Sequence, residues 1–425
     1  MKKRNILVFP CGSEIGLDIY SSVRYSTYFH LIGANSIEDH GSFVYDDYVG
    51  NIPFITDERF LPTIKKLVRE RHIDAIYPAM DSVITVLKQH EDELGCLVVT
   101  SSVETTEICL SKRKTYEVLR DTVCVPRLLN PATVDCYPVF VKPDVGYGSR
   151  GAQRIDDAAH LADVLSSRAD LLVLEYLPGE EYTVDCFTDR KGRLLYSGAR
   201  VRKRIRNGIS VNTSFVEDQT EFTALAEKLN EKIKFRGAWF YQVKRKADGT
   251  LCLMEMASRL GGSSLLSRAV GINMALMALF DTFGYDVAAQ QNNYRVTLDR
   301  ALSNRYKCDG LSYSTVYVDY DDCLILDKTQ VNVQLVAFLY QCINERKRIV
   351  LLTKHAGNLT EELKRFRLDT LFDEVRHIGE EEQKTAFVDT ADAIFIDDSF
   401  AERDRILRTK GIPVFSPEMI DVLSR

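Results

Sequence analysis

The 425-residue sequence lacks several features that would assign a protein to a class at once. No apolar run approaches 18 residues, which argues against a transmembrane helix, and the apolar stretch 6–9 is too short for a signal peptide. Neither a CxxC pair nor an HExxH motif occurs. The ten cysteines lie far apart, as in a reduced cytoplasmic protein. Acidic residues (61) outnumber basic ones (55), so the charge balance does not indicate nucleic acid or a membrane surface as a partner.

The length and the hydrophobic pattern indicate three domains, since 425 residues at about 150 per domain give roughly 2.8. Residues 1–104 alternate strands with helices, which is typical of a small doubly wound α/β domain. Residues 105–305 contain more antiparallel-looking strands, with a helix expected over 263–283. After a polar stretch at 290–309, residues 306–425 return to strand–helix alternation. The predicted fold class is α/β and α+β, with a Rossmann-like last domain.

The segment Pro138-VFVKPDVGYGSRG is the most informative part of the middle domain. A strand delivers Lys142, and a loop with three glycines follows it. The lysine can neutralise phosphate oxygens as a point charge, and glycines let backbone N–H groups approach such oxygens closely. By itself, the segment indicates either a phosphate-binding loop or an ordinary glycine-rich turn.

Two further segments follow in order, Leu174-EYLPGEEYTVD and Leu253-MEMASRLGG. The ordered set resembles the ATP-grasp superfamily, in the style of its carbamoyl phosphate synthetase and D-alanine ligase branches. The resemblance covers roughly residues 1–300 and includes a pre-ATP-grasp α/β domain. It implies ATP and Mg²⁺ as cofactors, and ATP-dependent ligation of a carboxylate to an amine through an acylphosphate, with ADP as a product.

The same resemblance implies roles for individual residues. Nucleotide contacts would come from Lys112, Lys142, Gly148, Ser149, Glu175, Tyr176, Leu177 and Glu181. Catalytic arginines would be Arg202, Arg204 and Arg259, and the magnesium ligands would be Gln242 and Glu255. Two plainer interpretations stay open: Lys112 as a solvated helix residue, and the arginines between 200 and 206 as a solvated strand face.

One position departs from the family pattern, which usually has Asn two residues after the metal-binding acid. Ala257 stands there in this sequence. Alanine offers no ligand oxygen, so one magnesium site should have fewer protein ligands. Because Mg²⁺ readily keeps waters, a water or Ser258 could complete the site.

The last domain carries a second ordered set of motifs. These are Ser314-TVYVDYDDCL, Arg348-IVLLTKH, Glu382-QKTAF and Ala393-IFIDDSF. Most of their polar residues follow strands, where α/β folds place ligands. The set resembles the haloacid dehalogenase superfamily of phosphatases. The spaces between its motifs are too short for a large cap domain, so the predicted site is open.

This second resemblance implies an aspartyl-phosphate mechanism. Asp319 would be the nucleophile and Asp321 the general acid and base, with Thr353 and Lys384 holding the phosphoryl oxygens. Magnesium would be bound by Asp319, Asp321, Asp397 and Asp398. Clustered carboxylates repel one another unless a cation is present, which itself indicates a metal. A decayed domain kept only for packing is the alternative.

The sequence therefore predicts a bifunctional cytoplasmic enzyme, an ATP-grasp carboxylate–amine ligase fused to a magnesium-dependent phosphomonoesterase. The expected partners are small-molecule carboxylates and amines, one of which could be phosphorylated, with no nucleic acid and no membrane. An oligomer stays open. The alternatives are a ligase with a regulatory C-terminal domain, and a nucleotide-sensing protein without ligase activity.

Overall fold

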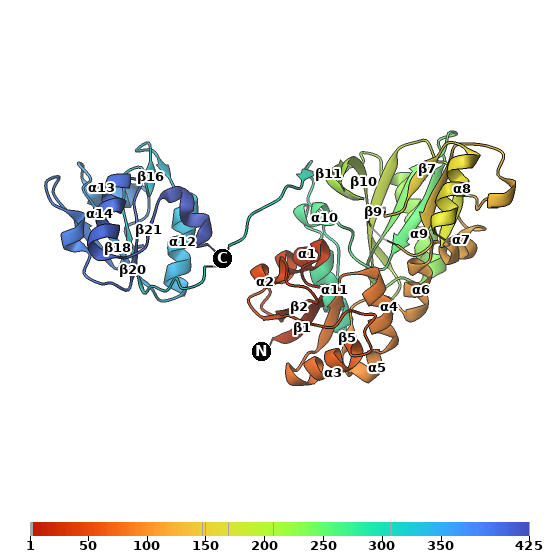
Figure 1. Cartoon of the computed structure of the whole chain (residues 1–425), viewed down its shortest axis with the longest axis horizontal. Helices are drawn as coiled ribbons and strands as arrows, with labels where there is room; N and C mark the ends of the chain where they lie inside the picture. The colour runs from red at the N-terminus through yellow and green to blue at the C-terminus, as the bar shows by residue number, and fades with distance from the viewer. Residues whose placement is uncertain are drawn as a thin grey trace. The chain divides into compact units, whose positions relative to one another are not determined.

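The computed structural model describes residues 3–146, 148, 150–168, 170–206, 208–306 and 308–424. The chain divides into two compact units, residues 1–302 and 303–425 (Figure 1). The domain boundary predicted between residues 104 and 105 falls inside the first unit and stays a prediction. Among the described residues, no helix combines the length and the apolar character needed to cross a bilayer.

The first unit begins with a parallel five-stranded sheet in the order β3-β2-β1-β4-β5. Its strands are β1 (Arg4–Phe9), β2 (Phe29–Ala34), β3 (Tyr48–Val49), β4 (Ala75–Pro78) and β5 (Leu97–Val98). Ile6, Leu7 and Val8 are fully buried, as expected where helices cover both faces of a parallel sheet. The helices of this region are α1 (Glu14–Val23), α2 (Gly41–Val44), α3 (Phe60–Glu70), α4 (Asp81–Gln89), α5 (Glu91–Leu94), α6 (Val103–Leu110) and α7 (Lys112–Leu119).

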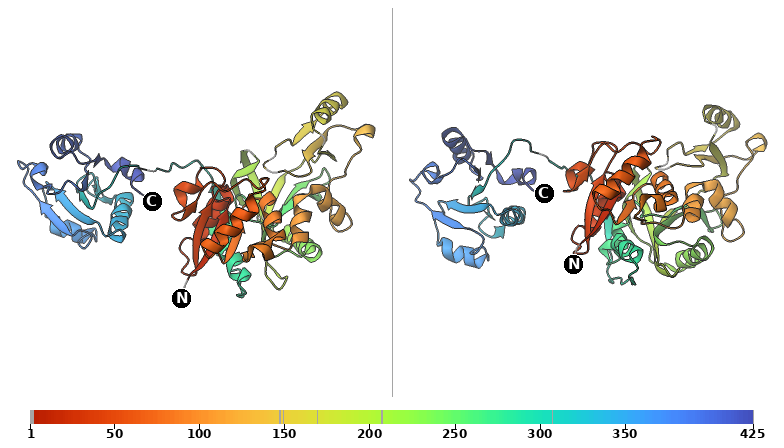
Figure 2. Two further views of the ribbon diagram at one scale, coloured as in Figure 1. Left: turned by 60° about the horizontal axis from the view of Figure 1, so that its bottom comes forward. Right: turned by 90° about the horizontal axis from the view of Figure 1, so that it is seen from below.

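Two antiparallel sheets form the rest of the first unit. A three-stranded sheet, β7-β6-β8, consists of β6 (Val139–Pro143), β7 (Gln153–Ile155) and β8 (Leu171–Glu175), with α8 (Ala158–Ser167) beside it. A six-stranded sheet in the order β13-β12-β9-β10-β11-β14 consists of β9 (Glu181–Thr188), β10 (Leu194–Arg206), β11 (Ile209–Phe215), β12 (Gly237–Arg245), β13 (Leu251–Ala257) and β14 (Thr297–Asp299). Figure 2 shows the three-stranded sheet and α8 as a lobe next to the larger sheet. Helix α9 (Thr220–Ile233) packs against β9 and β10.

The helix predicted over 263–283 is in fact two helices, α10 (Leu265–Ala269) and α11 (Met274–Thr282). Gly271 lies between them with φ of 104°, a conformation that favours glycine and ends a right-handed helix. The polar stretch expected at 290–309 is not wholly irregular, because β14 lies within it and pairs with β11. Sequence periodicity alone did not show either feature.

The second unit is a parallel five-stranded sheet in the order β19-β18-β15-β20-β21. Its strands are β15 (Thr315–Val318), β18 (Arg348–Thr353), β19 (Glu374–His377), β20 (Ala393–Ile396) and β21 (Val414–Phe415), and a small hairpin joins β16 (Ile325–Leu326) to β17 (Gln330–Val331). Its helices are α12 (Val333–Asn344), α13 (Leu359–Arg365) and α14 (Phe400–Lys410), with short 3₁₀ turns at Lys384–Phe387 and Pro417–Val422. The central strands β15 and β20 end directly before Asp319 and Asp397, so both carboxylates lie at the carboxyl edge of the sheet.

Candidate functional site

One face of the six-stranded sheet carries three rows of side chains. Residues paired across antiparallel strands point to the same side, and alternate residues along a strand share a face. The rows are Glu181 with Lys244, then Thr183 with Gln242 and Glu255, then Asp185 with Phe240 and Ala257. The two predicted magnesium ligands, Gln242 and Glu255, are therefore direct cross-strand neighbours in the middle row.

Two lysines predicted to meet phosphates lie close to this face. Lys142, at the end of β6, is buried, and its Nζ donates to the Met254 carbonyl at 2.9 Å. Burial lowers the pKa of Lys142 to about 8, and the positive charge of Lys112 acts in the same direction, whereas Glu255 opposes the shift. Lys112, at the start of α7, donates from Nζ to the carbonyls of Asp144 (3.2 Å) and Gly146 (3.3 Å). The Lys112 ammonium thus lies beside the glycine-rich loop, and the Lys142 ammonium lies against β13.

A pocket next to Lys142 contains the three residues predicted to meet the adenine. It has about 330 Å³ of empty space and is lined by Pro126, Phe140, Lys142, Leu174, Glu175, Tyr176, Leu177, Lys244 and Met254. Most of these side chains are apolar or present long alkyl stems, which is typical of small-molecule pockets. A flat, mostly apolar base fits this lining.

Glu175 is held in place by cations on neighbouring elements. Its carboxylate accepts the Arg127 backbone N–H at 3.0 Å and the Lys246 ammonium at 3.1 Å. Burial raises the pKa of Glu175, but these hydrogen bonds and charges outweigh it, so the pKa lies below its usual range. The side chain is therefore ionised and fixed.

The glycine-rich loop packs closely against the turn between β10 and β11. Gly148 has φ of 64°, and a Cβ on Gly208 would lie 2.5 Å from the Gly148 carbonyl carbon. Glycine is thus required at 208 for the approach of two backbones. Ser149, the other loop residue predicted to bind nucleotide, lies outside the described residues.

The two predicted arginines of β10 point in different directions. Arg202 is buried and forms an ion pair with Glu181 at 2.9 Å, whereas Arg204 has a side chain that is 60% exposed and pairs with Asp299 at 2.6 Å. The register of β10 against β11 shifts on both sides of Arg204. Such a bulge reverses the alternation of a strand. The structure therefore places Arg202 beside Glu181, on the face that carries the three rows, and Arg204 at the surface.

Two ion pairs near the three rows of side chains were not predicted from the sequence. Arg259 donates to both carboxylate oxygens of Asp81, at 2.8 and 2.6 Å. Arg200 donates from Nε to Asp185 at 2.7 Å, and both of these side chains are buried. Two signals were available: Asp81 follows an apolar parallel strand, where ligands gather, and Asp185 is a charge within an apolar strand.

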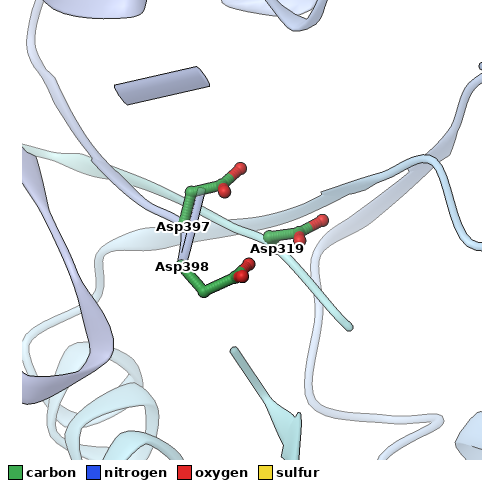
Figure 3. A group of neighbouring side chains, drawn as sticks. All are labelled: Asp319, Asp397 and Asp398. Atoms are coloured by element: carbon green, nitrogen blue, oxygen red, sulfur yellow. The ribbon is translucent and has the colours of Figure 1, made fainter. Parts of the chain in front are cut away.

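In the second unit, three carboxylates meet at the carboxyl edge of the sheet. Asp319, Asp397 and Asp398 each place an oxygen within 4.8 Å of the others, and Figure 3 shows the three side chains turned to the same side. Lys384 Nζ lies 2.7 Å from Asp319 and 2.6 Å from Asp397. Burial and the charge of Asp319 raise the pKa of Asp397 to about 6, although Lys384 acts against this.

The carboxylate cluster fits a divalent cation by the chemistry of its donors. Three acids face one ammonium group, so the cluster keeps surplus negative charge. Burial and the negative charge of Asp319 also raise the pKa of Asp398. Carboxylate oxygens are the ligands that Mg²⁺ prefers, and a bound cation would stabilise their ionised forms. Asp321 lies outside this group of three.

Asp321 and Thr353 meet a residue that sequence reasoning did not single out. His355 Nδ1 lies 3.0 Å from each carboxylate oxygen of Asp321, and the His355 backbone N–H donates to Thr353 Oγ1 at 3.2 Å. His355 stands two positions after Thr353 in the predicted motif. That closeness was the one signal available in the sequence.

Comparison with known families finds a match for the second half of the first unit. Residues 167–301 match the family model described as ATP-grasp in the biosynthetic pathway with Ter operon. The chain carries an ATP-grasp domain. A sequence search of curated proteins finds no match.

Solved structures share the fold of the ATP-grasp unit. The biotin carboxylase of Campylobacter jejuni, solved as a β-γ-ATP complex, is similar with a TM-score of 0.58 at 17% identity, over 70% of this chain and 75% of that chain. The L-amino acid ligase of Bacillus licheniformis gives 0.54 at 17% identity, over 66% and 74% of the two chains. The N5-carboxyaminoimidazole synthetase of Staphylococcus aureus gives 0.54 at 14% identity, over 68% and 79%.

The paired ligands of the ATP-grasp domain fit a magnesium ion. Among the described residues, no hydrogen-bond partner is found for the side chains of Gln242 and Glu255, so their oxygens are free to bind a cation. Ala257, on the same face, is buried and adds no oxygen. The neighbouring Ser258 has its Oγ 3.4 Å from Thr100 Oγ1. That a water or Ser258 completes the site stays a prediction.

Proposed function

We propose that the first unit ligates a carboxylate to an amine with conversion of ATP to ADP and phosphate. The observation that carries the proposal is the cross-strand pair Gln242–Glu255 beside the buried ammonium of Lys142. Oxygen ligands for Mg²⁺ and a cation for phosphate thus share one face of the sheet. The solved L-amino acid ligase and N5-carboxyaminoimidazole synthetase of similar fold support a ligase of this type.

The order of the rows suggests how the substrates lie. The pocket at Tyr176 takes the adenine, and Glu181 takes the ribose hydroxyls. Lys142 and Lys112 then neutralise the phosphates near the middle row.

The chemistry proceeds in two displacements. A carboxylate oxygen of the substrate attacks the γ-phosphorus of ATP, and the bond to the β-phosphate oxygen breaks, giving an acylphosphate and ADP. The amine nitrogen then attacks the acyl carbon, loses a proton and expels phosphate. Positioning and charge neutralisation by Lys142 and the arginines Arg202 and Arg259 are the protein's contribution. Mg²⁺, held by Gln242 and Glu255, would neutralise phosphate charge.

The second unit is proposed to hydrolyse a phosphomonoester. Asp319 attacks phosphorus, and the leaving oxygen keeps the electron pair of the broken bond and takes a proton from Asp321. Water then attacks the aspartyl-phosphate while Asp321 accepts its proton, which releases phosphate and restores Asp319. Lys384 and Thr353 hold the phosphoryl oxygens. Mg²⁺ at Asp319, Asp397 and Asp398 would offset the charge of the phosphoryl group.

The fusion suggests a shared molecule. Linking two sites in one chain raises the effective concentration of one at the other, up to about millimolar with a short linker. This helps when a product of one site is the substrate of the other. A phosphorylated amine, ligated by the first unit and dephosphorylated by the second, satisfies both chemistries.

The test of the ligase proposal is a screen of carboxylate–amine pairs that reads ADP formation with Mg·ATP. At least one pair should give steady ADP release that needs both substrates, and Lys142→Ala should abolish it. The matched control is Lys228→Ala, because Lys228 is exposed on α9. ATP binding without ADP release for any pair would favour a nucleotide sensor instead.

The phosphatase proposal has a separate assay. The full-length protein with Mg²⁺ should release p-nitrophenolate from p-nitrophenyl phosphate, and Asp319→Asn should abolish this release. A wild-type protein with ligase activity but no phosphatase activity would favour a regulatory role for the second unit.

A further inference from the structure

His355 links two motif residues of the second unit through separate parts of its structure. The residue follows β18, and its backbone N–H donates to Thr353 Oγ1 at 3.2 Å. Its ring reaches Asp321, with Nδ1 at 3.0 Å from both Oδ1 and Oδ2. The contact spans 34 residues of sequence, so the fold and not the chain order brings the two side chains together.

The imidazole ring of His355 has little freedom to turn. Its side chain is 11% exposed, and the Tyr320 ring meets it edge-on with 4.9 Å between ring centroids. His377 Nε2 lies 2.6 Å from the His355 carbonyl oxygen and holds the backbone from the other side. A ring fixed in this way can fix the orientation of the carboxylate that it contacts.

The surroundings of Nε2, the His355 ring nitrogen that does not contact Asp321, indicate which nitrogen carries the proton. Nε2 is buried and has no hydrogen-bond partner among the described residues. A Cβ at residue 357 would lie 2.6 Å from Nε2, so glycine there provides the space for the ring. A buried donor without an acceptor is costly, whereas Nδ1 faces carboxylate oxygens. The tautomer that suits these partners has its hydrogen on Nδ1 and donates it to Asp321.

We propose that His355 is a positioning residue that holds the Asp321 carboxyl group for proton transfer to the leaving oxygen. The inference rests on the proposed phosphomonoesterase activity of the second unit. When Asp321 is protonated, His355 Nδ1–H donates to the carboxyl oxygen that lacks the proton, and this hydrogen bond fixes the carboxyl group while its other oxygen holds the proton for the leaving group. The side chain of Asp321 is 42% exposed, so without His355 it would sample several orientations.

This role matters most for a leaving group that cannot depart as an anion. Asp319 attacks phosphorus, and the phosphorus–oxygen bond to the leaving group breaks with its electron pair on that oxygen. An alkoxide needs the Asp321 proton as it forms, whereas p-nitrophenolate is stable without one. Loss of His355 should therefore slow the hydrolysis of alkyl phosphates more than the hydrolysis of p-nitrophenyl phosphate. A merely structural loss would slow both esters alike.

The experiment compares kcat/KM of the full-length protein with Mg²⁺ on p-nitrophenyl phosphate and on glycerol 2-phosphate. This parameter covers the steps up to departure of the leaving group and leaves out the later attack of water. His355→Phe removes the donor but keeps a ring against Tyr320. His355→Asn keeps an N–H near the position of Nδ1. Circular dichroism and thermal melting establish that each variant is folded.

His355→Phe should lower kcat/KM for glycerol 2-phosphate about 10- to 100-fold, which is the scale for a misplaced catalytic group. It should lower kcat/KM for p-nitrophenyl phosphate less than about threefold. His355→Asn should recover most of the loss. Equal losses on both esters in folded variants, or no loss, would overturn the inference while the phosphatase proposal stands. A wild-type protein that hydrolyses neither ester would overturn the phosphatase proposal and the inference with it.

Discussion

Arg259 and Asp81 form a two-pronged ion pair, in which Nε and Nη2 of the arginine donate to the two carboxylate oxygens at 2.8 and 2.6 Å. Asp81 is the first residue of α4, which follows β4 of the parallel sheet in the sequence, whereas Arg259 follows β13 of the ATP-grasp sheet. The guanidinium carbon also lies 5.2 Å from the centroid of the Phe240 ring. The pair therefore connects the N-terminal sheet to the row of side chains next to the predicted metal ligands.

Asp81→Ala should lower the free energy of unfolding of the first unit by about 1–3 kcal/mol, because Arg259 would keep its charge in a largely buried place without its partner. Ligation should weaken as well, since Arg259 would lose its fixed orientation. Urea denaturation and ADP release measure the two effects. Asp92→Ala is the control, because Asp92 is an exposed acid on α5. If both variants behave like the wild type, the pair has no structural importance.

ATP affinity should depend on pH through Lys142. Burial lowers the pKa of this lysine to about 8, so it is charged below that pH and loses its proton as the pH rises. Phosphate favours the charged form, so binding above pH 8 takes up a proton, and Kd should rise about tenfold per pH unit. Lys142→Arg stays charged throughout this range. Calorimetry from pH 7 to 9.5 should show a Kd for ATP that rises with pH in the wild type and stays constant in the variant. The same pH dependence of Kd in both proteins would contradict this.

The magnesium requirement should depend on Ala257. Alanine offers no ligand oxygen, so the predicted magnesium site has one protein ligand fewer. Ala257→Asn would add an amide oxygen on the face of Glu255 and should lower the Mg²⁺ concentration at half-maximal ADP release. Titrations of both proteins with Mg²⁺ at saturating ATP test this. Superimposable curves would show that Asn cannot reach the metal or that water already suffices.

Asp319→Asn should separate the two proposed reactions. The variant loses the proposed nucleophile of the second unit, but the ATP-grasp sheet belongs to the first unit and keeps its proposed ligands. ADP release should stay close to the wild-type rate, and a phosphorylated amide should accumulate, visible by mass spectrometry. The same final product from both proteins would mean that the two sites do not act in sequence.

Much of the fold could be predicted because its central strands are continuous apolar runs. Residues 6–9 and 393–396 are buried on both faces of parallel sheets, and such strands need no alternation to be recognised. The polar residues that follow these strands were also visible, including Asp319 and Asp397. The break at Gly271 was not, because a single glycine is tolerated within a helical pattern and only the backbone conformation reveals the turn.

Side-chain direction and long-range partners could not be predicted. Arg202 and Arg204 look alike in sequence, and a bulge in β10 sends one inward and the other to Asp299. The partner of Arg259 lies 178 residues away in the chain, which no local motif can show. Such contacts depend on how separate sheets pack, and packing is not encoded in the spacing of any one motif.

The central claim is that Mg·ATP binds on the face that carries Lys142, Gln242 and Glu255. Titration calorimetry of Mg·ATP into the full-length protein tests it most directly, with Lys142→Ala compared against Lys228→Ala. The wild type and Lys228→Ala should bind one ATP per chain with the same affinity. Lys142→Ala, folded by circular dichroism, should bind at least about tenfold more weakly, since one well-placed charge contact is worth about 1.4 kcal/mol or more. Unchanged affinity in a folded Lys142→Ala protein would contradict the account.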